Sequence, residues 1–247
     1  VDPAESGIPA PREEVHRALV VIVTADRGLA GAFNTNVIKT AEHLIASEYA
    51  ALNESGNLDL LCIGRKGHEH FDRRGYRLVG DYRGFFHDLK FEQASGISEV
   101  LIDGYVAETW DKVVIVYNEF RNTIAQNRIV EPFLPMPEFF QTPVMESSED
   151  YRLNESGGKD LDYIFEPGVA QMAWPLLIQY LDFQLWRILL ESNASEQGAR
   201  MVAMENATTN AGELLRELQL HYNQARQAAI TTEILEISSG AEALANG

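Results

Sequence analysis

The polar and glycine residues best placed to do chemistry lie where a predicted strand passes into a predicted helix, in the run TADRGLAGAFN at residues 24–34. In nucleotide-binding folds this position cradles phosphate groups, because backbone N–H groups face the ligand there. The run lacks the Gly-Lys-Ser/Thr of a P-loop, however, and it does not match GxGxxG. We therefore favour a tight turn in which Gly28 and Gly31 relieve backbone strain and Asp26 or Asn34 caps the helix.

A metal site is the second candidate, at His68-Glu69-His70. Histidines at positions i and i+2 point apart on a helix, and no third ligand is near in the sequence. The spacing therefore favours a solvated surface over a metal centre.

Acid–base and nucleophilic residues give no stronger signal. Asp111, Glu119 and Arg121 flank the ends of a predicted strand, but nothing in their spacing indicates paired carboxylates tuned for proton transfer. No serine or cysteine lies in a nucleophile-elbow context. The residues by themselves indicate no enzyme.

Composition limits the class of protein. The 247 residues are enough for one large domain or two smaller ones, and no window approaches the 18 or more consecutive apolar residues of a membrane span. The single cysteine, Cys62, excludes an internal disulfide framework and suits a reducing compartment. The formal net charge of −17 argues against general nucleic-acid binding, and it favours either basic partners or a salt-rich habitat.

The order of the predicted elements is typical of an α/β domain. The predicted strands are residues 18–24, 58–63, 78–79, 112–117 and 129–134, and the predicted helices are residues 34–54, a short segment ending at residue 73, and 95–110. Ser95 is expected to cap the last of these helices. Strands that alternate with helices in this way predict an open parallel sheet. Residues 1–11 are expected to be a linker and residues 146–159 a surface loop.

The stretch from residue 194 to residue 239 predicts one long helix with an apolar seam. The seam residues follow one another at steps of four and three, as in a coiled coil: Ala211, Leu215, Leu218, Tyr222, Ala225, Ala229 and Thr232. A helix that begins near Val169 is roughly 70 residues long, or about 105 Å. We expect so long a helix to protrude and to need a partner. The alternative is a helical hairpin that turns at Gly198, at Gly212 or in residues 206–210.

Two blocks of sequence carry a resemblance to a known family. VIVTADRGLAGAFNTNVIK, at residues 21–39, closely resembles the signature at the start of the α/β domain of the F-type ATP synthase γ subunit. Residues 194–244, which begin ASEQGARMVAMENATTNAGELLRELQ, closely resemble the C-terminal block of that family. The resemblance covers nearly the whole chain. The signature residues on which it depends in the first block are Asp26, Arg27, Gly28 and Gly31.

The resemblance implies a fold and a set of partners. The implied fold is a Rossmann-like α/β domain with a parallel sheet, residues 1–168 with the linker, followed by residues 169–247 as the long C-terminal helix of an antiparallel coiled coil. In the family this rotary shaft passes through the α3β3 hexamer, and proton flow turns it so that the β sites change state. The implied partners are the α3β3 hexamer, the ε subunit and the c-ring. No cofactor, metal or catalytic residue of the chain's own is implied.

The resemblance also implies contact residues on the shaft. The positions that match contacts with β-subunit loops are Arg200, Arg226, Gln227, Thr231 and Glu233, and an apolar bearing near the tip is formed by Ile230, Ile234 and Ile237. Arg226 would offer a rigid charged fork to acidic β loops. Without the resemblance, Arg226 reads as an ordinary exposed charge on a helix.

One departure from the family is visible. The family's shaft has a long N-terminal helix, and this sequence begins at Val1 with the segment that follows that helix. We expect the sequence to begin late or to be a fragment. In that case the seam faces water, and we expect the isolated chain to fray along its C-terminal helix or to self-associate through it.

Two other functions stay open at this point. One is a nucleotide-binding α/β protein, which has only the turn at Gly28 to support it, and the other is a coiled-coil adaptor unrelated to ATP synthesis. The location implied by the resemblance is the cytoplasmic side of a bacterial inner membrane, with peripheral attachment through the complex.

Overall fold

A computed structural model gives the structure of the chain and describes residues 12, 14–123, 125–136 and 169–245. The chain divides into two compact units, Val1–Arg200 and Met201–Gly247. The first unit contains a sheet covered by helices, and the second is helical. The predicted linker at residues 1–11 and the predicted loop at residues 146–159 lie outside the described residues. The proposed domain boundary at residues 168 and 169 stays a prediction.

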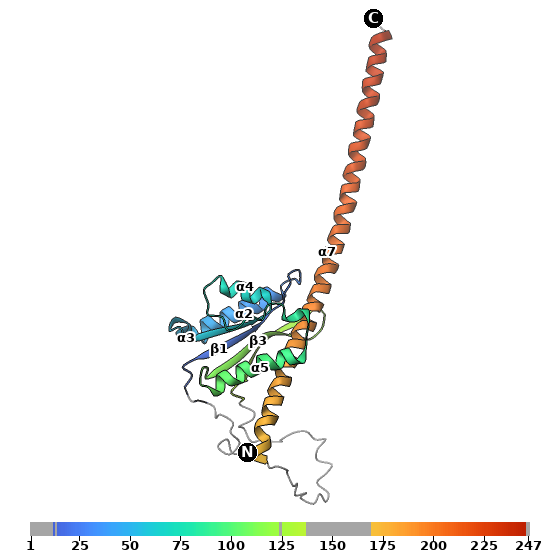
Figure 1. Ribbon diagram of the computed structural model, residues 1–247. Coiled ribbons are helices and arrows are strands. Elements are labelled where there is room, and N and C mark those ends of the chain that lie inside the picture. The colour runs from blue at the N-terminus through green and yellow to red at the C-terminus, as the bar shows by residue number, and fades with distance from the viewer. Residues whose placement is uncertain (1–11, 13, 124, 137–168, 246–247) are drawn as a thin grey trace, which may run out of the picture. The chain divides into compact units, whose positions relative to one another are not determined.

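The first unit is built on a four-stranded mixed sheet (Figure 1). Its strands are β1 (Ala18–Val23), β2 (Leu58–Ile63), β3 (Lys112–Phe120) and β4 (Gln126–Leu134), in the order β2-β1-β3-β4. β1 pairs in parallel with β2 and with β3, as the buried apolar runs predict. β4 pairs with β3 in antiparallel orientation. The predicted parallel sheet is thus confirmed for β2, β1 and β3, and β4 adds an antiparallel edge because the short connection after β3 allows only a hairpin.

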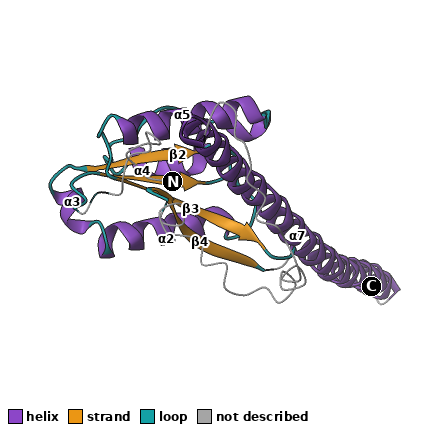
Figure 2. Ribbon diagram, turned by 90° about the horizontal axis from the view of Figure 1, so that it is seen from below, coloured by secondary structure: helices purple, strands orange, loops and turns teal. Residues whose placement is uncertain are grey.

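Alternate residues of the strands face two separate cores. Leu19, Val21 and Val23 of β1 face a core closed by α5 (Phe91–Val106) and by the first part of α7 (Val169–Ala245). Ala18, Val20 and Ile22 face the opposite core, which α2 (Phe33–Ser47) and α4 (Arg65–Asp72) cover. Figure 2 shows α5 and α2 on opposite sides of the sheet. The α/β fold class is therefore confirmed, with both faces of the sheet buried.

Several predicted boundaries were wrong in detail. The helix expected at residues 34–54 is interrupted, so that α2 is followed by the short α3 (Ala50–Glu54). α5 starts four residues before the predicted Ser95, and its N-cap is Lys90. The Ser95 hydroxyl instead donates to Asp182 Oδ2 of α7 over 2.7 Å, so it links two helices. Residue 78 makes an isolated parallel bridge to Leu60 rather than a strand, and a short 3-10 helix, η1 (Phe85–His87), precedes α5.

Substitution of two glycines of α5 by alanine is expected to change the stability of the fold in opposite directions. A Cβ at Gly104 would lie 1.9 Å from Cζ3 of the Trp110 ring, whereas a Cβ at Gly96 meets nothing within 4 Å. We expect Gly104→Ala to destabilise the fold by roughly 1–3 kcal/mol through overpacking. Gly96→Ala is expected to stabilise it by about 0.5–1 kcal/mol, because alanine favours the helix. Urea unfolding followed by tryptophan fluorescence measures both, and two changes of the same sign would contradict the packing argument.

α7 is one continuous helix of 77 residues, and it begins at Val169 as expected. It runs without interruption across residues 206–210 and Gly212, so the hairpin alternative was wrong. In the first unit its buried residues recur at helical spacing: Leu177, Leu181, Leu185, Ile188 and Leu189. This stripe is what closes the core on the α5 side of the sheet.

In the second unit every described side chain from Met204 onward is exposed. The seam residues Leu215, Leu218 and Tyr222 are 58%, 57% and 67% exposed. A helix of this length with exposed leucines along one stripe is unusual in a soluble monomer, because burial of such a stripe normally stabilises the helix.

Candidate functional site

Asp26 is the centre of the signature turn, although the sequence assigned it only to a helix cap. Its Oδ1 atom accepts the backbone N–H groups of Arg65 over 2.9 Å and of Gly84 over 2.8 Å, and its Oδ2 atom accepts the N–H of Phe86 over 3.1 Å. The side chain is 6% exposed. One carboxylate therefore holds three loops together: the turn after β1, the start of α4 and the start of η1.

The other polar side chains of the turn also bind protein groups. Thr24 Oγ1 accepts the N–H of Gly67 over 2.8 Å, and Asn34 Oδ1 accepts the N–H of Ala25 over 2.8 Å. Asn34 Nδ2 donates to the carbonyl of Arg27 over 3.3 Å. The side chains of Thr24 and Asn34 are thus engaged inside the turn. The Asp26 carboxylate in the same turn would repel an anionic phosphate.

Two details of the predicted turn were wrong. The N-cap of α2 is Ala32, with no side-chain cap from Asp26 or Asn34, and Asp26 satisfies the first N–H of α4 instead. Among the two glycines, only Gly31 has a positive φ, of 56°, and the other left-handed residue is Leu29, with a φ of 62°. Gly28 therefore does not relieve strain, and its carbonyl serves as an acceptor instead.

Arg200, a residue of α7, contacts the signature turn. Its Nη1 atom donates to the carbonyl of Gly28 over 3.3 Å, and its Nη2 atom donates to Glu196 Oε1 over 2.5 Å. A polar cavity of about 300 Å³ lies beside these groups, and Asp26, Arg27, His87, Asn193 and Gln197 also line it. Arg200 is thus a link between α7 and the signature turn, a role that its position in the sequence did not indicate.

Glu196 is a buried carboxylate in this cavity, 5% exposed. Burial raises its pKa above the ordinary value, the Arg200 guanidinium opposes that rise, and the Asp26 carboxylate adds to it. Because the net shift is upward, the folded state binds this proton more tightly than the unfolded state does. Glu196 therefore costs stability as the pH rises from about 4.5, its ordinary pKa, through the raised pKa.

Glu196→Gln mimics the protonated carboxyl. We expect the variant to match the wild type below the ordinary pKa and to become the more stable of the two as the pH rises through the raised pKa. Unfolding by urea at several pH values between 4 and 8 measures the difference. Glu205→Gln, an exposed residue of the same helix, controls for the loss of one charge. If Glu196→Gln instead lowers stability at pH 8, the ion pair with Arg200 dominates over the cost of burial.

A second polar network joins β4 to α7. Tyr117 donates to Glu131 Oε2 over 2.8 Å, and Arg187 Nη2 lies 2.9 Å from Glu131 Oε1. Arg187 Nη1 lies 3.1 Å from Glu191 Oε1. Burial and the neighbouring Glu131 carboxylate raise the pKa of Tyr117. With a phenol, a guanidinium and two carboxylates paired to one another, this network is suited to fixing α7 on the sheet.

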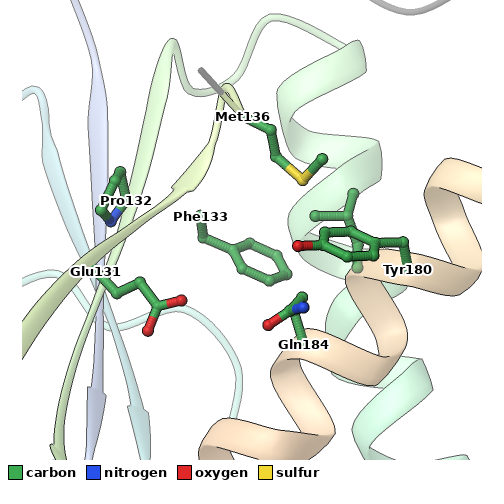
Figure 3. A pocket seen from close by; sticks show the side chains of 7 residues that line it. Glu131, Pro132, Phe133, Met136, Tyr180 and Gln184 are labelled. Carbon is green, nitrogen blue, oxygen red and sulfur yellow. The ribbon is translucent and has the colours of Figure 1, made fainter. Parts of the chain in front are cut away.

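A small pocket of about 130 Å³ lies beside that network (Figure 3). Glu131 and Phe133 of β4 and Tyr180 and Gln184 of α7 point toward the same space. Gln184 Oε1 accepts Arg187 Nε over 3.0 Å, so its amide also belongs to the network. Among the described residues that line the pocket, Glu131 is the one carboxylate, and it is already paired with Arg187.

Asp111, a weak catalytic candidate in the sequence, holds the segment that leads into β1. Its Oδ1 atom accepts Arg12 Nη1 over 2.6 Å, and its Oδ2 atom accepts the N–H groups of His16 and Arg17 over 2.9 and 2.8 Å. Burial alone would raise the pKa of Asp111, but these three donors outweigh it and lower the pKa. Its contribution to stability is therefore present above its ordinary pKa near 3.8 and is lost on acidification.

The histidine pair of α4 does not converge on one point. His70 Nε2 lies 2.9 Å from Glu42 Oε1, and Arg74 Nη1 approaches the same oxygen over 3.1 Å. Burial and the nearby Arg74 charge lower the pKa of His70. In the part of the chain that the structure describes, no group of three or more His, Cys, Asp or Glu side chains is placed to hold a metal ion.

The predicted contact residues of the shaft, apart from Arg200, lie in the second unit and are all exposed: Arg226, Gln227, Ile230, Thr231, Glu233, Ile234 and Ile237. Residues three or four apart are neighbours on a helix, so Arg226, Ile230, Glu233 and Ile237 follow one face. Thr231 donates to the carbonyl of Gln227 over 2.9 Å, which leaves its hydroxyl oxygen free to accept. The helix therefore presents polar and apolar groups side by side, and the contacts that they make stay a prediction.

Within the described residues, no helix is both long enough and apolar enough to cross a membrane. The side chains that sequence reasoning missed are Glu131, Arg187 and Glu196. Each is a charged residue with a distant partner or a buried position. The local signals were the spacings of Arg187 from Glu191 and of Glu196 from Arg200, each by one helical turn, and neither indicated the contact with the sheet or with the signature turn.

The comparisons with known proteins agree on one family. Residues 3–244 match the family model described as ATP synthase. The chain is 55% identical over 233 residues to the ATP synthase gamma chain of Salinibacter ruber, a match that covers 94% of this chain and 76% of the relative. It is 48% identical over 244 residues to that of Prosthecochloris aestuarii, which covers 99% of this chain and 79% of the relative.

Solved structures share the fold. A chain from the structure of the central stalk and c-ring of the Tetrahymena thermophila mitochondrial ATP synthase matches with a TM-score of 0.55 and 24% identity, over 83% of this chain and 82% of that chain. A chain of the Euglena gracilis mitochondrial ATP synthase, solved with OSCP, F1 and the c-ring, matches with a TM-score of 0.63 and 22% identity, over 94% and 74%. The α/β unit and the continuous long helix agree with these matches, and the chain belongs to the ATP synthase gamma-chain family.

Proposed function

We propose that this chain transmits rotation between the membrane ring and the catalytic sites of ATP synthase, without catalytic residues of its own. The observation that carries the proposal is the continuous helix α7, whose 77 residues span about 115 Å at 1.5 Å per residue. A rigid element of that length can carry torque between sites that no compact domain connects. The buried stripe from Leu177 to Leu189 anchors one end of it to the α/β unit.

The exposed seam of α7 supports the coiled-coil part of the proposal. Leu215, Leu218 and Tyr222 are more than half exposed, and their spacing suits knobs-into-holes packing against a second, antiparallel helix. Two helices packed in this way resist bending and twisting better than one. The partner helix thus makes the shaft stiff enough to carry torque.

The coupling itself requires contacts that differ with orientation. An asymmetric shaft inside an α3β3 hexamer presents different faces to the three β subunits, so each orientation stabilises a different set of site conformations. The face that carries Arg226 and Ile230 is suited to β-subunit loops. The ε subunit and the c-ring are the proposed partners of the α/β unit, on the cytoplasmic side of the membrane.

Nucleotide binding by the chain itself is not part of the proposal. The turn lacks the Gly-Lys-Ser/Thr of a P-loop, and the carboxylates of Asp26 and Glu196 both line the polar cavity beside it, where they would repel a phosphate. Purification of the tagged chain from its source membranes should recover α, β and c subunits with it. Recovery of the chain without them, or saturable ATP binding to the isolated chain in equilibrium dialysis, would overturn the proposal.

Arg226→Ala is expected to lower coupled ATP synthesis by about tenfold, because a rigid charged fork at an interface is lost. Arg226→Lys should recover only part of the activity, because an ammonium group cannot make the bidentate contact. Arg216→Ala removes another exposed arginine from the same helix and serves as the matched control. ATP synthesis and ATP-driven proton pumping in inverted membrane vesicles measure all three. Equal losses of ATP synthesis in the Arg226 and Arg216 variants would show that the effect comes from net charge and not from a specific contact of Arg226.

A further inference from the structure

A basic segment stands out in this acidic chain. Residues 65–83 contain six of the chain's 20 lysines and arginines, namely Arg65, Lys66, Arg73, Arg74, Arg77 and Arg83. The same segment contains only three acidic residues, so its formal charge is +3 in a chain whose net charge is −17. A local reversal of charge of this size attracts anions to one part of the surface.

Two arginines of this segment line an open cavity of about 500 Å³. It lies between the turn that joins α3 to β2 and the residues that follow α4, and Arg74 and Arg77 are the charged residues among those that line it. Gly56 and Gly75 form two of its walls with positive φ values of 73° and 77°, and a Cβ at either would meet nothing within 4 Å. Bare backbone therefore keeps the approach to the two guanidinium groups open.

Each guanidinium group forms an ion pair with one carboxylate. Arg77 Nε lies 2.9 Å from Oδ1 of Asp59, whose side chain is only 2% exposed, and Trp110 Nε1 fixes the other oxygen of Asp59 over 2.8 Å. Arg74 Nη1 lies 3.1 Å from Oε1 of Glu42. The remaining N–H groups of both arginines have no partner among the described residues, and the two side chains are half or more exposed.

This arrangement resembles the way that ligand-binding arginines are positioned in general. A guanidinium group that is fixed at one edge loses less side-chain entropy when its other edge binds a ligand. The two free edges, together with the Asn53 amide in the same cavity, need more acceptor atoms than the two oxygens of a carboxylate. A phosphoryl group offers three or more oxygens in a tetrahedral arrangement, which suits two forks that approach from different directions.

We propose that this cavity binds a phosphoryl group through Arg74 and Arg77. The shared chemistry admits two sources, a free phosphate anion and the headgroup of an anionic lipid. The site lies at the β2 end where Leu58 begins the strand, and the signature turn follows the other end of β1. It is separate from the residues on which the rotary function depends.

Titration of the ¹⁵N-labelled full chain with inorganic phosphate at constant ionic strength tests the first source. We expect saturable shifts in the backbone amide signals of Gly56, Gly75 and Tyr76. Arg74→Gln is expected to weaken binding by about tenfold or more, because one charge-assisted contact is lost. Arg73→Gln is the matched control, since Arg73 is 78% exposed and lies outside the cavity. Acetate at the same concentration should give no saturable shift.

Flotation with vesicles of phosphatidylglycerol, compared with phosphatidylcholine, tests the second source. Binding to the anionic vesicles that Arg74→Gln abolishes and Arg73→Gln preserves would support the lipid headgroup. Binding that both variants weaken equally would show diffuse electrostatic attraction, and it would overturn the site. Failure of both probes to bind, or equal shifts with acetate, would also overturn it.

The second variant is Arg77→Lys rather than Arg77→Gln, because a positive charge is needed beside the buried Asp59 carboxylate. Its circular dichroism spectrum checks that it folds.

Discussion

Replacing Asp26 by alanine is expected to lower the free energy of unfolding of the α/β unit by roughly 3–5 kcal/mol. The carboxylate accepts three backbone N–H groups, from Arg65, Gly84 and Phe86, and it is almost fully buried. Alanine leaves these donors without an acceptor, and each buried donor without a partner costs about 1–3 kcal/mol. Water that enters the adjacent polar cavity can satisfy part of the loss, which keeps the total below the simple sum.

Urea unfolding followed by tryptophan fluorescence reports on this unit, because Trp110 is buried in it. Asp81→Ala is the matched control. Asp81 also accepts a backbone N–H and pairs with an arginine, Arg83, but its side chain is 53% exposed, so that water replaces what is lost. We expect little change for the control. Similar losses for Asp26→Ala and Asp81→Ala would show that the three-loop junction does not stabilise the fold beyond an ordinary surface pair.

Leu218→Ser is expected to destabilise the assembled central stalk by roughly 3 kcal/mol, while it leaves the α/β unit unchanged. Leu218 is 57% exposed in the chain alone, so its truncation removes nothing that the isolated chain has buried. In a coiled coil the same side chain lies in the seam between two helices, where the loss of a buried leucine costs about 2–5 kcal/mol. The retention of the chain in purified ATP synthase should then fall by about 100-fold at equilibrium.

Leu220→Ser separates a seam effect from a general loss of apolar surface. Leu220 is 59% exposed, almost the same as Leu218, but it lies two residues further on and hence on another face of the helix. We expect the Leu220 variant to assemble nearly as well as the wild type. Both variants can be compared by ATP-driven proton pumping and by subunit content after purification. Equal losses for the two leucines would contradict the seam register that the heptad spacing predicts.

The two experiments address different requirements of the proposed rotary shaft. The Asp26 junction keeps the loops at the end of β1 rigid, and Arg200 joins them to α7 within the same unit. The seam around Leu218 is proposed to make the helix stiff through a second helix. A substitution at Asp26 is expected to unfold the α/β unit. A substitution in the seam is expected to leave that unit folded but to impair the transmission of torque along the helix.

Local patterns in the sequence were enough for the main elements. The apolar run at residues 58–63 coincides with β2, Leu58–Ile63, and the run at 18–24 contains β1, Ala18–Val23. The long helix covers the whole of residues 194–239, where the apolar spacing predicted it. These predictions succeeded because side-chain periodicity depends on which face of an element is buried, and that information lies within a few consecutive residues.

Features that depend on distant partners could not be predicted in this way. Ser95 was expected to cap a helix, but its hydroxyl contacts Asp182, which is 87 residues away in the sequence. Asp26 was expected to cap α2, but its acceptor atoms serve residues 39, 58 and 60 positions further on. A capping residue and a loop anchor have the same local sequence, and only the packing of other loops around the side chain distinguishes them.

The sequence by itself determined the family, through two specific blocks, and it determined the α/β class. It also predicted a long helix with an apolar seam, and the structure showed that this helix is continuous rather than a hairpin. Only the tertiary structure showed that Glu196 and Arg200 lie against the signature turn, and that Arg187 reaches Glu131 of β4. It also placed β4 antiparallel to β3 and set Arg74 and Arg77 around one cavity. Backbone propensity and periodicity are local properties that a short window of residues records, whereas ion pairs and buried hydrogen bonds form between groups that become neighbours only when the chain folds.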